Sequence, residues 1–380
     1  MRKFVSGALL LAACTGGAGG PPSAPAVAPA SAPVAFDYLI GVSSESGDII
    51  TWIRPGPDTL IVDRVVPVGI MPADIDGPHN ITMAPDQKSY YVSIAHGAPY
   101  GTLWRMDAAT DSLLGRAPLE FYPTTIALTP DGELAFVANS DFFGDRPRQN
   151  PLSIVHTPEM LKIAEVTACD MPHGVRVNHA GTTVYVTCMH SDELLEMEVA
   201  TFDITRRAST GAGAAAPAAA PAGAGHEHGA VTCAPTFVAV APDDRTLYVA
   251  CNTGNTLQVW DAASLARLAE IPVGKGAYNV EPSPDGTHVI VTNKKDRSVS
   301  LVDARTRTEV ARIPTTKPVV HGVAWSPDGR YAYISQESVG ADPGAVDMID
   351  VAGRRVVATV PLPAQPTGIT IHRRAAAPAN

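Results

Sequence analysis

A short motif recurs seven times along this 380-residue chain and constrains the fold more than any other feature. We call its second residue the marker position, because it is the easiest point of each copy to align. The markers are, in chain order, His79, Thr124, His173, Thr236, Tyr278, His321 and Thr367. The intervals between them are 45, 49, 63, 42, 43 and 46 residues. A period in the forties, built from short strands, is typical of β-propellers.

The same order of strand and turn signals follows each marker. Alternating apolar residues lead into a turn such as Pro-Asp-Gly at 130–132, 284–286 and 327–329. Proline presets φ, aspartate bonds its own backbone and glycine accepts a positive φ, so these turns join hairpins. A strand-forming run follows, then a third run that ends in aspartate, and then a fourth. Each unit therefore predicts one four-stranded antiparallel blade.

Two of these runs resemble a known repeat family. FVAN at 136–139 and IVTN at 290–293, together with the Pro-Asp-Gly turns, are similar to the motif of the YVTN β-propeller family. The resemblance covers residues 36–373. It implies a fold and says little about function, because propellers carry many unrelated activities.

The two ends of the repeat region indicate how the ring closes. Residues 37–66 supply three strands that lack a first strand, and residues 368–371 supply a first strand alone. We therefore predict an all-β fold, a seven-bladed β-propeller of four-stranded antiparallel blades. The seventh blade would pair N- and C-terminal strands, which removes the open sheet edges that promote aggregation.

The N-terminus reads as a targeting signal. Arg2 and Lys3 precede an apolar stretch at 4–13 that is too short to span a bilayer. It ends in Leu-Ala-Ala followed by Cys14, which resembles the bacterial lipobox and implies lipidation of that cysteine. An ordinary signal peptide with a chance cysteine is the alternative. Thr15 in the next position resembles outer-membrane sorting, which places the protein in the bacterial cell envelope, on the periplasmic or surface face.

The expected domain organisation follows from these features. Residues 1–13 would be the signal peptide, 14–35 a lipidated flexible tether rich in Gly, Pro and Ala, and 36–373 the propeller. Residues 208–229 form a low-complexity insertion, and 374–380 a disordered tail. The lipid anchor would be the only membrane contact. A net charge of −10 without any basic run argues against nucleic acid as a partner, and we expect a monomer.

Histidines occupy two equivalent positions of the repeat. His79, His173 and His321 are markers, while His96 and His190 follow the second strand of the blades of His79 and His173. In a propeller both positions face the mouth of the central funnel, where a small molecule, a metal or a protein partner would bind. Several imidazoles without clustered carboxylates favour a transition metal. We therefore predict a metal site formed by these five histidines.

Soft ligands close to His190 favour copper over zinc. Met189 and Cys188 directly precede it, and His226 and His228 in the insertion would be additional ligands. The simpler interpretation is that each histidine bonds a neighbouring carbonyl or water. Tyr278, with Lys294 and Lys295 close by, would line an anion-accepting side of the funnel, although a solvated surface is the simpler explanation.

A histidine-lined propeller resembles two redox families. Nitrous oxide reductase holds copper on a ring of histidines, and dissimilatory nitrite reductase holds a haem with histidine as ligand and acid. This sequence lacks the paired histidines and cupredoxin domain of the first, and the Cys-x-x-Cys-His motif of the second. Haem is therefore a less favoured cofactor than copper or zinc. The fold also resembles the propeller lactonases, whose site has no counterpart that we can match.

Three functions remain open from the sequence. The main hypothesis is an exported, lipid-anchored propeller that binds a transition metal, with copper favoured, through the funnel histidines. The alternatives are a metal- or haem-dependent oxidoreductase or lactonase-type hydrolase, and a metal-free scaffold that binds a peptide or glycan. We assign no catalytic residue, and the sequence leaves open whether the protein is an enzyme.

Four cysteines remain after the lipobox. Cys188 and Cys251 hold the same repeat position in adjacent blades, and Cys169 and Cys233 each lie just before a first strand. Pairs Cys169–Cys188 and Cys233–Cys251 would be disulfides within one blade each, which an exported protein allows. Four cysteines permit three pairings, and free thiols or metal ligands are the alternative.

Overall fold

The computed structural model describes residues 36–69, 75–96, 101–142, 150–213, 218–219 and 230–373. The chain divides into two units, Met1–Ala35 and Phe36–Asn380, and all described residues belong to the second. The predictions for the signal peptide, the tether, Cys14, His226, His228 and the tail lie outside the described residues.

Seven antiparallel sheets form the blades of a β-propeller, as the repeat predicts. We number them I to VII. Blade I contains β4 (Pro78–Met83), β5 (Ser89–Ile94), β6 (Thr102–Asp107) and β7 (Leu113–Pro118). Blade II contains β8 (Pro123–Leu128), β9 (Leu134–Asn139), β10 (Asn150–His156) and β11 (Leu161–Cys169). Blade III contains β12 (Pro172–Val177), β13 (Thr183–Cys188), β14 (Glu193–Glu198) and β15 (Ile204–Ser209). Blade IV contains β17 (Pro235–Val240), β18 (Thr246–Cys251), β19 (Thr256–Asp261) and β20 (Ala266–Pro272). Blade V contains β21 (Ala277–Pro282), β22 (His288–Asn293), β23 (Ser298–Asp303) and β24 (Thr308–Pro314). Blade VI contains β25 (Val320–Trp325), β26 (Tyr331–Gln336), β27 (Gly344–Asp350) and β28 (Arg355–Leu362).

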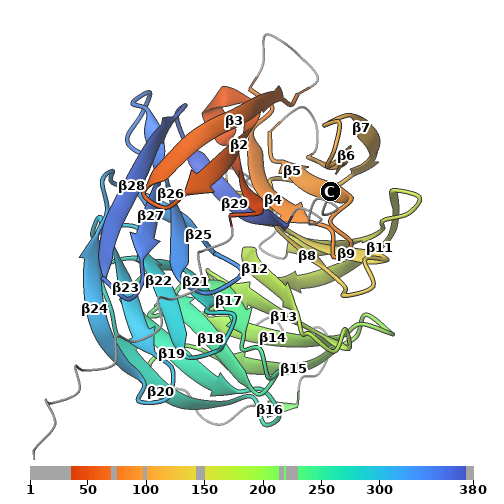
Figure 1. Ribbon diagram of the computed structural model, residues 1–380. Coiled ribbons are helices and arrows are strands. Elements are labelled where there is room, and N and C mark those ends of the chain that lie inside the picture. The colour runs from red at the N-terminus through yellow and green to blue at the C-terminus, as the bar shows by residue number, and fades with distance from the viewer. Residues whose placement is uncertain are drawn as a thin grey trace, which may run out of the picture. The chain divides into compact units, whose positions relative to one another are not determined.

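Blade VII closes the ring with both ends of the repeat region. The C-terminal strand β29 (Pro366–Arg373) pairs with β1 (Tyr38–Ser44), which continues into β2 (Ile49–Gly56) and β3 (Thr59–Pro67). Figure 1 shows blue β29 among the red and orange N-terminal strands. The predicted closure is confirmed.

The hydrophobic core lies between adjacent blades. The second strand of blade I is buried along its whole length, whereas β11, the outer strand of blade II, alternates exposed and half-buried residues before it ends in two buried ones. Between blades VII and I, Trp52 packs edge-on against Tyr90 with ring centroids 5.2 Å apart. Both side chains donate hydrogen bonds to the Asp111 carboxylate. Inner strands covered on both faces and outer strands covered on one give the apolar patterns seen in the sequence.

A backbone turn is repeated at the mouth of every blade. The residue two positions before each marker has a left-handed φ of 49° to 69°, although only two of the seven are glycine. Its carbonyl accepts a hydrogen bond of 2.8 to 3.1 Å from the residue that follows the neighbouring second strand. The donor–acceptor pairs are Ala95–Gly77, Ser140–Tyr122, Met189–Met171, Asn252–Ala234, Lys294–Gly276, Glu337–Val319 and Glu45–Gln365. This repeated bond stabilises a conformation that L-residues seldom adopt, and it fixes two side-chain positions per blade at the mouth.

Two disulfides join cysteines near the mouth, Cys169–Cys188 and Cys233–Cys251. The second lies within blade IV, as expected. The first differs from the expectation of a bond within one blade, because Cys169 is the last residue of β11 in blade II while Cys188 ends β13 in blade III. It therefore ties two neighbouring blades together.

The insertion follows β15, the fourth strand of blade III. Two of its residues, β16 (Ala218–Ala219), pair with β15 as a short fifth strand. Within the described ranges, no helix is long and apolar enough to cross a membrane.

Candidate functional site

The side chains of four markers meet at the centre of the ring. His79, His173, Tyr278 and His321 come from the first strands of blades I, III, V and VI. Ring centroids lie 5.6 Å apart for His79 and His321, 4.7 Å for Tyr278 and His321, and 5.4 Å for His173 and Tyr278. All four are buried. We call this group the axial cluster; the repeat places it there because each first strand begins beside the axis.

Glu45 anchors one side of the axial cluster. Its carboxylate accepts hydrogen bonds from His79 Nδ1 at 2.9 Å, His96 Nε2 at 2.9 Å and the Tyr122 hydroxyl at 2.6 Å. Burial alone would raise the pKa of Glu45, but the charge and hydrogen bond of His79 and the bonds from His96 and Tyr122 outweigh it and hold the pKa far below the usual range. Glu45 is thus a fixed buried anion that joins blades VII, I and II.

His173 is held as a neutral imidazole of defined tautomer. Its Nδ1 lies 2.9 Å from the carbonyl oxygen of Thr236, which can only accept, so Nδ1 carries the proton. Its Nε2 therefore accepts the hydrogen bond from the Tyr278 hydroxyl, at 3.0 Å. Burial, helped by the nearby charge of His79, lowers the pKa of His173 to about 3, and burial raises the pKa of Tyr278 to about 12.

A lysine–glutamate pair lies over the other side of the axial cluster. Lys294 Nζ is 2.6 Å from Glu337 Oε1 and 4.1 Å from the centroid of the Tyr278 ring. Burial would lower the pKa of Lys294, but Tyr278 and Glu337 outweigh it and raise the pKa. Lys294 therefore stays positively charged and lies over the face of the Tyr278 ring, which attracts a cation.

His321 is the imidazole that the axial cluster leaves without hydrogen bonds. It is 2% exposed, and neither ring nitrogen has a hydrogen-bond partner among the residues that the structure describes. Glu337 Oε1 lies 3.7 Å from Nε2, which is too long for a hydrogen bond. Burial and the charge of Lys294 keep the pKa of His321 well below its usual value. The ring is neutral and keeps an unused lone pair.

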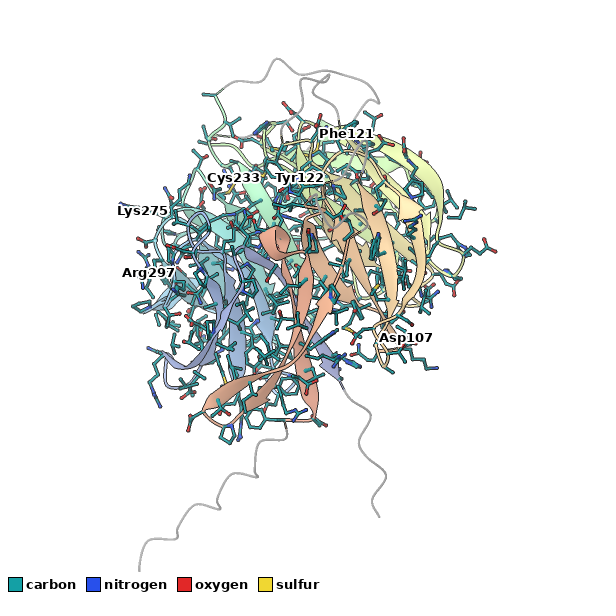
Figure 2. All side chains as sticks on the ribbon, turned by 90° about the horizontal axis from the view of Figure 1, so that it is seen from above. Asp107, Phe121, Tyr122, Cys233, Lys275 and Arg297 are labelled. Carbon is teal, nitrogen blue, oxygen red and sulfur yellow. A yellow bond between two sulfur atoms is a disulfide. The ribbon has the colours of Figure 1, made fainter. Side chains whose placement is uncertain are left out.

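The remaining expected ligands do not join this cluster. His190 is 55% exposed at its side chain, and its Nδ1 lies 3.7 Å from Asp170 Oδ1. Met189 is half-buried, and Cys188 is in a disulfide, so its sulfur is not a metal ligand. Figure 2 shows Tyr122 and Cys233 toward the mouth face and Asp107 toward the opposite face.

The expected copper or zinc site on five histidines is not supported. Across the described ranges, no group of three or more His, Cys, Asp or Glu side chains is placed to hold a metal ion. The physical reason is that the imidazole nitrogens have other partners. His79 and His96 bond Glu45, and His173 bonds Thr236 and Tyr278. The simpler interpretation, hydrogen bonding to neighbours, describes these three histidines.

Sequence reasoning missed Glu45, Tyr122 and Glu337. An alignment of the repeat points to two of them, because Glu45 and Glu337 both directly follow the second strand of their blades. Tyr122, two positions before its marker, has no such signal in the sequence. The charge pattern Glu45, Lys294, Glu337 at one repeat position is the signal, since uncharged residues hold that position in the other four blades.

Residues 289–372 match the family model described as the Cytochrome D1 heme domain. This segment covers less than a quarter of the chain and contains Lys294, His321 and Glu337. It extends from β22 into β29.

Solved structures of similar fold cover most of the chain. A chain of hydrazine synthase from Kuenenia stuttgartiensis is 20% identical with a TM-score of 0.63, over 81% of this chain and 100% of that one. A functionally unknown protein from Desulfotomaculum acetoxidans is 13% identical with a TM-score of 0.67, over 89% and 99%. The dihydro-heme d1 dehydrogenase NirN is 16% identical with a TM-score of 0.59, over 92% and 78%. At these identities the likeness concerns the fold.

Proposed function

We propose that this protein is a propeller that binds a haem-type tetrapyrrole at its funnel, with His321 as the iron ligand. The observation that carries the proposal is the buried imidazole of His321, which makes no hydrogen bond and lies inside the segment that matches the haem-domain model. One solved structure of similar fold, the dihydro-heme d1 dehydrogenase NirN, is named for a haem and points in the same direction.

The donor chemistry around His321 fits a haem. A neutral histidine is a common haem iron ligand, and the low pKa of His321 keeps its lone pair available at neutral pH. Lys294 supplies a cation for a carboxylate of the tetrapyrrole, and Tyr278 supplies an aromatic surface. Because His321 is 2% exposed, binding requires that side chains around it move. The Lys294–Glu337 pair is the part whose rearrangement would uncover Nε2.

The iron, when bound, would supply electron transfer or the binding of a small ligand. The residues of the chain define its surroundings. Glu45 holds a fixed negative charge, and Tyr278 keeps its proton on the phenol and donates it in a hydrogen bond to His173. These groups would orient polar ligands and set the local charge.

The proposal includes export and a lipid anchor. The lipobox-like sequence before Cys14 supports lipidation, and the two disulfides support an oxidising compartment. We therefore propose that the propeller is tethered in the cell envelope through lipid on Cys14.

The test is the absorption spectrum of the full-length protein, recorded as purified and after addition of haem, with elemental analysis of the same sample. A Soret band with iron near one equivalent supports the proposal. Copper or zinc near one equivalent without a haem band contradicts it. The absence of any band shift upon haem addition also contradicts it.

A further inference from the structure

Positive charge is concentrated on one side of the mouth. Four of the seven lysines of this acidic chain lie in mouth loops next to β21, β22 and β25. We define the basic rim as Lys275, Lys295, Arg297 and Lys317. Figure 2 shows Lys275 and Arg297 on the same side of the molecule.

The basic rim is continuous and carries unneutralised charge. The Lys295 amide donates to the Lys275 carbonyl at 3.1 Å, and the Arg297 guanidinium donates to the carbonyls of Thr315 and Thr316, beside Lys317. Lys275, Lys295 and Arg297 are exposed, and none of the four rim side chains forms an ion pair with a described residue. The nearby acids are already engaged, Asp296 by Arg312 and Glu337 by Lys294.

The other side of the mouth, as far as the structure describes it, carries acids. In the described parts of the mouth loops of blades VII, I, II and III, acids such as Asp76, Glu120, Asp170 and Asp192 occur without any lysine or arginine. The described part of the mouth is thus divided into an acidic and a basic side. A divided surface orients an approaching charged partner and speeds its association, an effect that salt screens.

An exposed apolar side chain lies beside the basic rim. Val339 is 62% exposed in the loop after β26. Ser338, its neighbour, donates a backbone hydrogen bond to Pro318, the residue after Lys317. Asp342 is the one unpaired acid described in that loop. An exposed apolar side chain next to a cationic rim is typical of a protein interface, whereas a free inorganic anion would gain nothing from contact with the apolar residue.

The mouth faces away from the end of the propeller where the chain enters and leaves. Tyr38 pairs with Arg373 at the start of β1, whereas Ser44 pairs with Pro366 at the mouth end. The first and last described residues of the propeller, 36 and 373, therefore lie at the end opposite the basic rim.

We propose that the basic rim docks an acidic protein, with Val339 as an apolar contact at its edge. The rim lysines and Arg297 would pair with carboxylates of the partner, and the acidic side of the mouth would reject the reverse orientation. This inference does not depend on the haem proposal.

The test measures the binding of two dye-labelled glutamate-rich peptides to the full chain by fluorescence anisotropy, at low and at physiological salt. The two peptides are identical except that one of them carries a leucine at its centre. The rim variant K275E/K295E is compared with K88E/R330E, which makes the same charge change at exposed hairpin turns on the opposite face. V339S tests the apolar contact, and circular dichroism verifies that each variant is folded.

We expect both peptides to bind the wild type more tightly at low salt, with K275E/K295E weakening binding about tenfold and K88E/R330E changing it less than about twofold. The peptide that carries the leucine should bind more tightly than the peptide without it, and V339S should remove that difference. Equal binding by wild type and K275E/K295E, or an equal loss in K88E/R330E, overturns the proposal. If K275E/K295E weakens binding but V339S has no effect, the proposal of an acidic protein as the partner is overturned, and the basic rim binds any polyanion.

Discussion

The Tyr278 hydroxyl donates a hydrogen bond to His173 Nε2 at the axis of the propeller, over 3.0 Å. The two residues hold the same repeat position in blades III and V, with blade IV between them. Blade IV contributes the carbonyl of its own marker, Thr236, which fixes the His173 tautomer. Three copies of one repeat position thus make a single hydrogen-bonded unit, although they are far apart in sequence.

Removal of the Tyr278 hydroxyl should destabilise the fold. Y278F leaves the Nε2 of His173 buried without its donor, which costs about 1–3 kcal/mol of unfolding free energy. The control is Y331F, because Tyr331 is half-buried and its hydroxyl has no hydrogen-bond partner in the described part of the chain. Urea unfolding should show a loss in Y278F and a change within about 0.5 kcal/mol in Y331F. Equal stability of the two variants would contradict the assigned hydrogen bond.

Neutralising Glu45 should have a larger effect. E45Q removes the buried anion that holds His79, His96 and Tyr122, and loss of one partner of a buried pair costs about 3–5 kcal/mol. The control E133Q alters a carboxylate that is 57% exposed and lies 3.6 Å from His156. It should change the unfolding free energy by less than about 1 kcal/mol.

The contribution of Glu45 should also depend on pH. Because the pKa of the folded state is depressed, the stabilisation is present above the ordinary value of 4.5 and is lost as the pH falls below it. The difference in unfolding free energy between wild type and E45Q should therefore be constant near neutral pH and shrink below about pH 4.5. A constant difference down to acid pH would show that Glu45 is not a buried anion.

Each disulfide should contribute separately to stability. The bonded cysteines are 19 and 18 residues apart, so each closes a loop worth about 2–4 kcal/mol. C169S/C188S and C233S/C251S should lower the midpoint of urea unfolding by similar amounts. A reductant should lower the midpoint of the wild type more than that of either variant, because the wild type loses two disulfides and each variant only one. A reductant that leaves the wild-type midpoint unchanged would contradict the bonds.

The lipid anchor can be tested apart from the fold. C14A removes the proposed lipidation site, so the protein should move from the membrane to the soluble fraction and lose label from radioactive palmitate. S23A, in the same segment, should stay in the membrane fraction. An unchanged distribution of C14A would contradict lipidation at Cys14.

The repeat was sufficient to predict the blades, the closure and the position of the marker histidines at the axis. Those features follow from local periodicity, because each blade repeats the same strands and turns. The marker position also predicted that His79, His173 and His321 would lie near one another.

The partners of these histidines were beyond the reach of residue types alone. Glu45 reaches His79 and His96 from blade VII, the neighbouring blade, and the carbonyl of Thr236 is invisible in a side-chain pattern. Five imidazoles on one face suggested metal ligation, but the Glu45 carboxylate and the Thr236 carbonyl engage three of them. The sequence pattern predicted that Cys169 belongs to blade III, but β11 of blade II extends to that residue.

The most direct test of the account is haem titration of full-length wild type, H321A and H288A, followed by absorption spectroscopy. His288 is at the start of β22, on the face opposite the mouth, and serves as the matched control. We predict the same Soret band and stoichiometry for wild type and H288A, and a lost or shifted band for H321A that added imidazole restores. H321A should remain folded, because neither ring nitrogen makes a hydrogen bond. A folded H321A that binds haem with the wild-type spectrum would contradict His321 as the iron ligand.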